Sequence, residues 1–150
     1  MLYIASDHAG FELKEYLKQS LAKRGLKIKD FGARIYNKED DYPDFIIPLA
    51  KTVGKNPTRN RGIILGGSGQ GEQIAANKIR GVRAALYYGG PIDIVTLSKT
   101  HNNTNILSLG ARFLNKKEAL RAVLLWIGTS FANVTRHKRR IKKIDEFTKQ

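Results

Sequence analysis

Short apolar runs alternate with longer segments of helical periodicity along nearly the whole chain. In the helical segments the apolar residues recur every three or four positions, as Leu13, Leu17 and Leu21 do. The apolar runs predict buried strands over residues 2–5, 26–31, 62–65, 82–87 and 106–109. Strands that alternate with helices form a parallel sheet covered by helices on both faces, so the order of segments predicts an α/β fold.

The helical segments begin at Phe11 and near Pro43, and continue over residues 72–79, 92–99 and 116–131. Residues 40–44 read Asp-Asp-Tyr-Pro-Asp, a turn that can cap the helix at Pro43. The chain of 150 residues has the length of about one domain. We therefore expect a single Rossmann-like, three-layer domain over residues 1–150, with a five-stranded parallel sheet and a basic C-terminal helix.

The composition excludes several classes of site. Cysteine is absent, so the chain has no disulfide, no cysteine-based zinc site and no thiol nucleophile. The longest apolar runs, such as residues 122–127, are far shorter than the ~20 residues that span a bilayer. The N-terminus lacks the basic stretch and long apolar stretch of a signal peptide. We therefore expect a cytoplasmic protein that does not enter membranes.

Lysine and arginine outnumber the acidic residues and give a net charge of +14, which favours anionic partners such as nucleic acids or phosphorylated metabolites. The charge is concentrated near the C-terminus, where residues 136–143 read Arg-His-Lys-Arg-Arg-Ile-Lys-Lys. A charged helix of this kind can bind nucleic acid. Alternatively, Arg136 and Arg140 share one helical face and can grip a phosphate, while most of the lysines are simply solvated.

A glycine-rich loop, residues 66–71, connects the third expected strand to a helix. Backbone N–H groups in such a loop can bind an anion at the helix N-terminus, although a tight structural turn would also use glycines. The loop matches neither the Walker motif nor the dinucleotide-binding motif.

Glu72 directly follows the glycine-rich loop. From the residues alone Glu72 is more simply an acidic residue in a first helical turn, but it could also be a general base.

Ligands of parallel α/β sheets bind beyond the carboxyl ends of the strands. This rule places four segments at the site: Asp7-His8, Tyr42, residues 66–72 and residues 101–103. The histidines His8, His101 and His137 lack the close spacing of a metal site, so acid–base or hydrogen-bonding roles are favoured over metal binding.

Six motifs together resemble the ribose-5-phosphate isomerase B family. They are Ser-Asp-His-Ala-Gly-Phe-Glu-Leu-Lys (6–14), Asp-Tyr-Pro-Asp (41–44), Gly-Gly-Ser-Gly-Gln-Gly-Glu-Gln-Ile-Ala-Ala-Asn-Lys (66–78), His-Asn-Asn (101–103), Leu-Gly-Ala-Arg (109–112) and Arg-His-Lys-Arg-Arg (136–140). The resemblance implies an aldose–ketose isomerase of the pentose phosphate pathway, which interconverts ribose 5-phosphate and ribulose 5-phosphate through an enediolate. It implies no metal and no organic cofactor.

The resemblance also implies roles for individual residues. Many members carry a cysteine base at the position of Gly66, but this chain resembles the branch whose base is a glutamate at the position of Glu72. By the same resemblance, Ser68 and the N–H groups of Gly67, Gly69 and Gly71 stabilise the oxyanion, and His101 opens the sugar ring. The residues implied to hold sugar oxygens are Asp7, Tyr42 and Asn102. Those implied to bind the phosphate are His8, Arg112, Arg136 and Arg140.

Members of the family place their sites between subunits, so the resemblance implies a homodimer or a dimer of dimers in which the C-terminal arginines reach the neighbouring site. Some relatives use six-carbon sugar phosphates, of allose or galactose, so an isomerase of a six-carbon sugar phosphate is an alternative function. A basic nucleic-acid-binding protein is the alternative of another class. Residues 87–91 are about two residues longer than the family pattern and are expected to shorten or reshape the following helix.

Overall fold

The computed structural model describes residues 1–147. Its strands are β1 (Leu2–Ser6), β2 (Ile28–Asp30), β3 (Arg61–Gly66), β4 (Ala84–Tyr87) and β5 (Ile106–Gly110). Its helices are α1 (Phe11–Ala22), α2 (Pro43–Lys55), α3 (Gln70–Asn77), α4 (Asp93–Asn102), α5 (Lys116–Gly128) and α6 (Thr135–Phe147). Strands and helices therefore alternate as the apolar pattern predicts, and the basic C-terminal helix is present.

Within the described residues the five strands form one parallel sheet in the order β2-β1-β3-β5-β4. β3 lies at the centre and pairs with β1 on one side and with β5 on the other. Ser6 pairs with Leu65, and Gly66 pairs with Gly110, so these three strands end together at one edge of the sheet. The expected Rossmann-like fold is confirmed.

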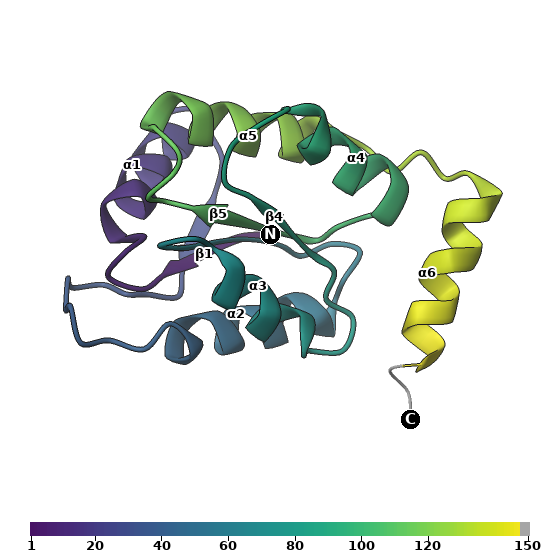
Figure 1. The fold of residues 1–150 in the computed structure, drawn as a ribbon, viewed down its shortest axis with the longest axis horizontal. Coiled ribbons are helices and arrows are strands. Elements are labelled where there is room, and N and C mark those ends of the chain that lie inside the picture. Colours follow the sequence, from purple (N-terminus) through teal and green to yellow (C-terminus); the bar gives the residue numbers. More distant parts are fainter. Residues whose placement is uncertain (148–150) are drawn as a thin grey trace.

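Helices cover both faces of the sheet, as Figure 1 shows: α1, α4 and α5 lie on one face, and α2 and α3 on the other. On the first face Leu17, Leu21 and Trp126 are fully buried against the sheet. On the second face Leu49 and Val53 of α2 are fully buried against Ile64 of β3. Strands apolar on both faces are typical of such three-layer sheets.

Several boundaries differ from those expected from the sequence. The helix after the glycine loop begins at Gln70 instead of residue 72, and α5 ends at Gly128 instead of residue 131, because Thr129 is extended. α4 spans Asp93–Asn102, so it continues three residues past the expected end at residue 99. In the connection before it, Gly89 and Gly90 both adopt positive φ, of 117° and 87°.

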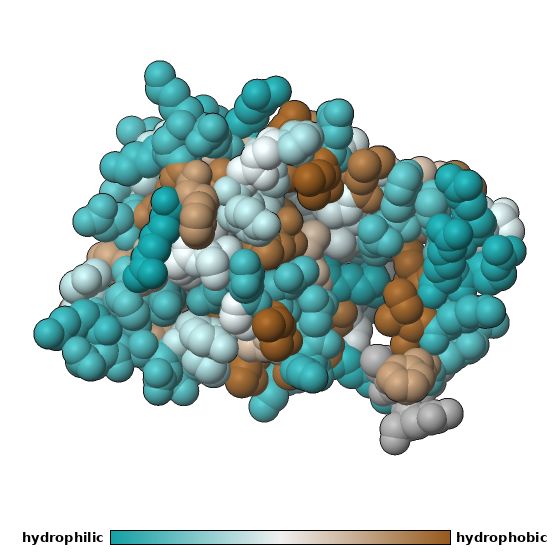
Figure 2. All heavy atoms as spheres, in the orientation of Figure 1, coloured by the Kyte–Doolittle hydropathy of each residue, from teal (hydrophilic) through white to brown (hydrophobic). Residues whose placement is uncertain are grey.

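α6 stands apart from the three layers and contacts mainly α4 (Figure 1). Figure 2 shows a hollow between α6 and the body of the molecule, where a cavity of about 640 Å³ lies between β4 and the side chains of Ile141 and Ile144. Ile144 and Phe147 nevertheless remain 56% and 77% exposed. Among the described helices, none is long and apolar enough to cross a membrane.

A lysine is buried where α4 meets α5. Lys99 is only 4% exposed, its Nζ donates to the carbonyl oxygen of Thr104 at 2.7 Å, and it lies 5.0 Å from the centre of the Trp126 ring. Burial lowers the pKa of Lys99 to about 8, and the nearby charges of Arg61 and Arg83 act in the same direction. The native state therefore releases this proton more readily than the unfolded chain does.

This burial predicts an unusual pH dependence of stability. Between about pH 8 and the ordinary lysine pKa of 10.5, the unfolded chain keeps a proton that the native state has lost, so rising pH stabilises the fold. The unfolding free energy of the wild type, minus that of Lys99→Met, should grow by about 1–2 kcal/mol from pH 8 to pH 10. Denaturant titrations measure this difference, and a constant difference would contradict the assignment.

Candidate active site

The turn between β1 and α1 supplies an acid and a histidine. Asp7 is buried, and its Oδ1 accepts a hydrogen bond from the backbone N–H of Gly10 at 3.1 Å. A Cβ at Gly10 would lie 2.8 Å from the backbone of Leu65, so only glycine lets the start of α1 approach β3 this closely. The neighbouring His8 is half-buried and contacts Asp40, with 2.7 Å between Nδ1 and Oδ1.

The glycine loop follows β3 and leads directly into α3. Gly69 has φ of 75°, a left-handed conformation that favours glycine, and the Ser108 hydroxyl donates to its carbonyl oxygen at 2.6 Å. The first N–H groups of a helix have no acceptor within the helix and carry partial positive charge. The amino end of α3, preceded by Ser68, therefore offers donors to an anion at the carboxyl edge of the sheet.

Glu72 lies in the first turn of α3 and is only 4% exposed. Its carboxylate occupies the space beside Gly66, where any Cβ would overlap it. Burial raises the pKa of the Glu72 carboxyl above its ordinary value of 4.5, partly offset by a hydrogen bond from its own backbone N–H, and the charge of Asp7 raises it further. A carboxylate whose pKa is raised in this way is suited to accept and return a proton near neutral pH.

Tyr42 and Arg112 close the loop from two sides. A Cβ at Gly71 would lie 2.9 Å from the Tyr42 hydroxyl, and one at Gly67 would lie 3.2 Å from the Arg112 guanidinium carbon. The backbone N–H of Arg112 also donates to the carbonyl oxygen of Gly67 at 3.0 Å. Both side chains therefore lie at the glycine loop, as the sequence predicts.

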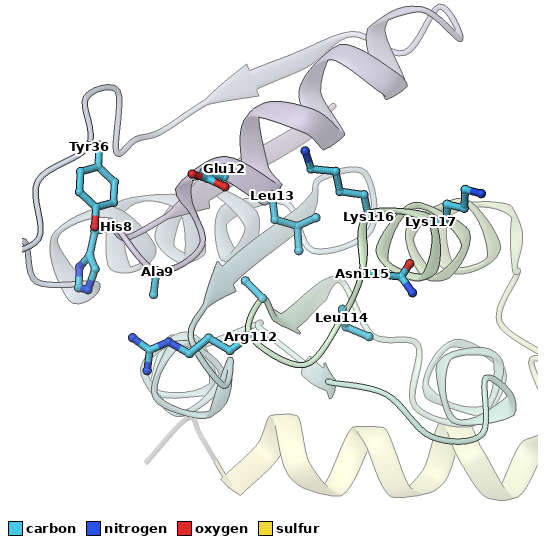
Figure 3. Close-up of a pocket in the computed structure, with 11 residues that line it drawn as sticks. His8, Ala9, Glu12, Leu13, Tyr36, Arg112, Leu114, Asn115, Lys116 and Lys117 are labelled. Atoms are coloured by element: carbon cyan, nitrogen blue, oxygen red, sulfur yellow. The ribbon is translucent and has the colours of Figure 1, made fainter.

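A cavity of about 800 Å³ opens at this edge of the sheet, between the β1–α1 turn and the start of α5 (Figure 3). Cationic side chains dominate its polar lining, with Glu12 as the acidic exception. These cationic or potentially cationic residues are His8, Arg112, Lys116 and Lys117. Such a lining favours an anionic ligand.

The remaining expected site residues lie elsewhere in the chain. His101 and Asn102 form the last turn of α4, which runs back across the sheet and ends just before β5 begins. The expectation that they lie at the carboxyl ends of the strands is therefore wrong. Ile106 and Gly110, the two ends of β5, are four residues apart, about 13 Å in a strand. His101 and Asn102 thus lie beside the amino edge, away from Glu72.

α6 joins this second group of residues. The rings of His101 and His137 stack with centroids 4.4 Å apart and an interplanar angle of 15°. Burial lowers the pKa of the buried His137 imidazole, and three neighbouring groups lower it further: His101, Arg136 and Arg140. The expected site residues therefore form two groups, one around Glu72 and one around His137.

No pattern in the sequence indicates the role of Asp40. Its turn is expected to cap α2, which does begin at Pro43, but no side-chain cap hydrogen bond is present at that helix start in the described chain. Asp40 instead holds His8, 32 residues away. Asp7, His8 and Asp40 also form a group whose ligand atoms lie within 4.8 Å of one another, close enough to share a cation. The His8–Asp40 contact already uses two of these three residues.

The chain matches the ribose/galactose isomerase family over residues 2–144. The chain belongs to this family. Ribose-5-phosphate isomerase B of Mycolicibacterium paratuberculosis is 41% identical over 146 residues, which cover 97% of this chain and 90% of that protein.

Solved structures of the ribose/galactose isomerase family agree with the fold. Ribose-5-phosphate isomerase B from Mycoplasma genitalium, with bound ribulose 5-phosphate, has a TM-score of 0.94 and 36% identity, covering 99% of this chain and 96% of that one. The Clostridium thermocellum enzyme of the same name has a TM-score of 0.90 and 39% identity, covering 99% and 97%. The family resemblance expected from the sequence motifs is confirmed.

The contact between Gly66 and Glu72 can be tested by adding one methyl group. Gly66→Ala should displace the Glu72 carboxylate and lower isomerase turnover by about 10²-fold, the cost of a misplaced catalytic group. The melting temperature should change little, because the atoms displaced are the end of a flexible side chain. Gly128→Ala is the matched control, since its added Cβ meets nothing within 4 Å. Unchanged turnover in Gly66→Ala would contradict the assignment of the Glu72 position.

Proposed function

We propose that the chain interconverts ribose 5-phosphate and ribulose 5-phosphate through an enediolate. The observation that carries this proposal is the buried Glu72 carboxylate at the amino end of α3, together with a cationic cavity at the same edge of the sheet. Relatives at about 40% identity bear the name ribose-5-phosphate isomerase B, and the Mycoplasma genitalium enzyme binds ribulose 5-phosphate. Both the chemistry of the site and its relatives support the same reaction.

In the proposed mechanism, Glu72 removes the proton from C2 of the open-chain aldose and returns it to C1. Its raised pKa brings its basicity closer to that needed for a reversible proton transfer near neutral pH. Negative charge then develops on O1, which takes a proton from the Ser68 hydroxyl, and the O2 hydroxyl gives its proton back to Ser68 as C2 becomes the carbonyl. Ser68, the loop N–H groups of Gly67, Gly69 and Gly71, and the positive end of α3 stabilise that charge as fixed dipoles. Proton transfer of this kind needs a base and oriented donors, without a redox carrier.

The cationic cavity would hold the phosphate end of the sugar. His8 and Arg112 line it, and a guanidinium can bind two phosphate oxygens at once. Asp7, whose charge acts on Glu72, and Tyr42, which lies at the glycine loop, would bind the sugar hydroxyls. The phosphate would thereby fix the distance between C1, C2 and the Glu72 carboxylate.

We further propose that each site is completed by a second copy of the chain. His101, Asn102, Arg136 and Arg140 lie on the side of the molecule away from Glu72, and the two arginines are exposed on α6. In a two-fold symmetric dimer the same pair of surfaces meets twice, so each α6 would reach the cavity of the other copy. His101 would then act on the sugar ring, Asn102 on a sugar oxygen, and both arginines on the phosphate.

Isomerisation of ribose 5-phosphate, allose 6-phosphate and galactose 6-phosphate, each measured with purified protein, tests the proposed substrate directly. Preferred turnover of ribose 5-phosphate supports the proposal. A preference for a six-carbon phosphate would show that the substrate is wrong while the isomerisation reaction is right. Salt-dependent binding of DNA or RNA without any isomerase activity would instead support the nucleic-acid-binding alternative.

Replacing the proposed base should separate activity from stability. Glu72→Gln keeps the shape of the side chain but cannot accept the proton, so kcat should fall by ~10²–10⁴-fold. The fold should become more stable at neutral pH. Because the folded pKa of Glu72 is raised, ionisation above pH 4.5 costs the native state more than the unfolded chain, and glutamine removes that cost. Steady-state kinetics and thermal unfolding measure the two effects.

Glu12→Gln provides the control, since Glu12 lines the cationic cavity but is exposed and lies outside the glycine loop. Its kcat should stay close to the wild-type value. Wild-type kcat in Glu72→Gln would show that another group is the base, and a loss of stability in that variant would contradict the account of the buried carboxylate.

The proposed shared site predicts complementation between two variants with low kcat/KM, measured at substrate concentrations well below the wild-type KM. Glu72→Gln damages one group of residues, and Arg140→Ala damages the other. In a mixed dimer one of the two sites combines Glu72 from one copy with Arg140 from the other. Random exchange of subunits should therefore restore about a quarter of the wild-type sites.

The measurement is the activity of each variant alone and of the mixture after subunit exchange, with heterodimers verified by native mass spectrometry. If heterodimers are verified and the kcat/KM of the mixture is only the mean of its two parents, both groups act within one copy.

A further inference from the structure

Asp40 makes two contacts with His8 and brings a distant loop to the β1–α1 turn. Its Oδ1 accepts the backbone N–H of His8 at 3.0 Å and lies 2.7 Å from the ring Nδ1. The Asp40 side chain is 8% exposed, whereas that of His8 is 26% exposed. The buried carboxylate therefore supports a histidine that itself remains open to the cavity.

The contact defines where His8 carries its proton. An ionised carboxylate can only accept hydrogen bonds, so the 2.7 Å contact requires a proton on Nδ1. Nε2 is then the only polar ring atom left for a ligand, and His8 lines the cationic cavity together with Arg112 (Figure 3). Without Asp40 the ring could rotate or exchange tautomers, and Nε2 would lose its fixed place.

The bonding of Asp40 indicates that this support is its main role. Its Oδ2 is buried and has no hydrogen-bond partner within residues 1–147, so both side-chain contacts run through Oδ1 to His8. Asp40 does not line the cavity itself, and the start of α2 next to it has no side-chain cap among the described residues. The carboxylate therefore reaches the cavity only through His8.

We propose that Asp40 is a positioning residue, which keeps Nδ1 of His8 protonated, so that the doubly protonated ring directs its Nε2–H at the phosphate group of the substrate. The identity of the phosphate ligand rests on the proposed function. The protonation of His8 Nδ1 by contact with Asp40 concerns the protein without substrate. Because the phosphate lies away from C1 and C2, loss of Asp40 weakens binding of the ground state and the transition state alike. Such a loss raises KM and leaves kcat nearly unchanged.

The kinetic test compares Asp40→Ala with Glu39→Ala, a neighbouring acidic residue that is 76% exposed. Asp40→Ala should raise KM for ribose 5-phosphate roughly tenfold, the effect of one charge-assisted hydrogen bond, with kcat within about threefold of wild type. Glu39→Ala should leave both unchanged. Asp40→Asn keeps an acceptor oxygen in the same place and should recover most of the lost affinity.

A double-mutant cycle separates positioning from general structural damage. In a His8→Ala background, Asp40→Ala should raise KM no further, because its effect passes through the ring that is already gone. A further tenfold rise in the double variant, or a fall in kcat that exceeds the rise in KM, would overturn the proposal.

Nitrogen NMR of the imidazole rings tests the inference without substrate. The chain has three histidines, so the His8 signals are assigned by comparison with His8→Ala. Nδ1 of His8 should be protonated in the wild type and in Asp40→Asn, and this preference should be lost in Asp40→Ala. An unprotonated Nδ1 in the wild type would overturn the inference, even if the protein is an active isomerase.

The two tests also distinguish this inference from the proposed function. If the wild type does not isomerise ribose 5-phosphate, the proposed function fails, and the tautomer of His8 alone decides whether Asp40 positions the ring. If the wild type is active and Asp40→Ala keeps the wild-type KM, the inference about Asp40 fails on its own.

Discussion

The central pairing of β3 with β1 and β5 is the constraint on which the candidate site depends. Because the three parallel strands end in register, the segments that follow them emerge at one edge of the sheet. The β1–α1 turn brings His8, the first turn of α3 brings Glu72, and the segment after β5 brings Arg112. Residues about a hundred positions apart in the chain thus meet without a dedicated binding domain.

The same edge combines buried acids with sources of positive potential. Asp7 and Glu72 both lose hydration on folding, and the pKa of Glu72 rises as a result. The amino end of α3 and the cationic wall around Arg112 act in the opposite sense, by favouring negative charge. A substrate anion would therefore enter a region of positive potential. The same region holds Glu72, whose ionised form is destabilised by burial.

The sequence predicts most of the segments that meet at this edge but misplaces the end of α4. Apolar runs and the glycine loop mark where strands end, so Asp7, His8 and residues 66–72 are placed correctly. His101 was misplaced because the rule for strand ends does not apply to the last turn of a helix that runs back across the sheet. Asp40 was missed because an acidic turn resembles a helix cap, and its partner lies 32 residues away. The burial of the Glu72 side chain likewise results from tertiary packing, which the local sequence does not reveal.

The contact at Gly66 has a consequence for how such sites can change over evolutionary time. The missing side chain at residue 66 leaves the space that the Glu72 carboxylate fills, and any Cβ there would overlap that carboxylate. A larger residue at position 66 therefore fits only where residue 72 becomes smaller at the same time. The two positions are coupled, so a lineage keeps the glycine for as long as it keeps the glutamate.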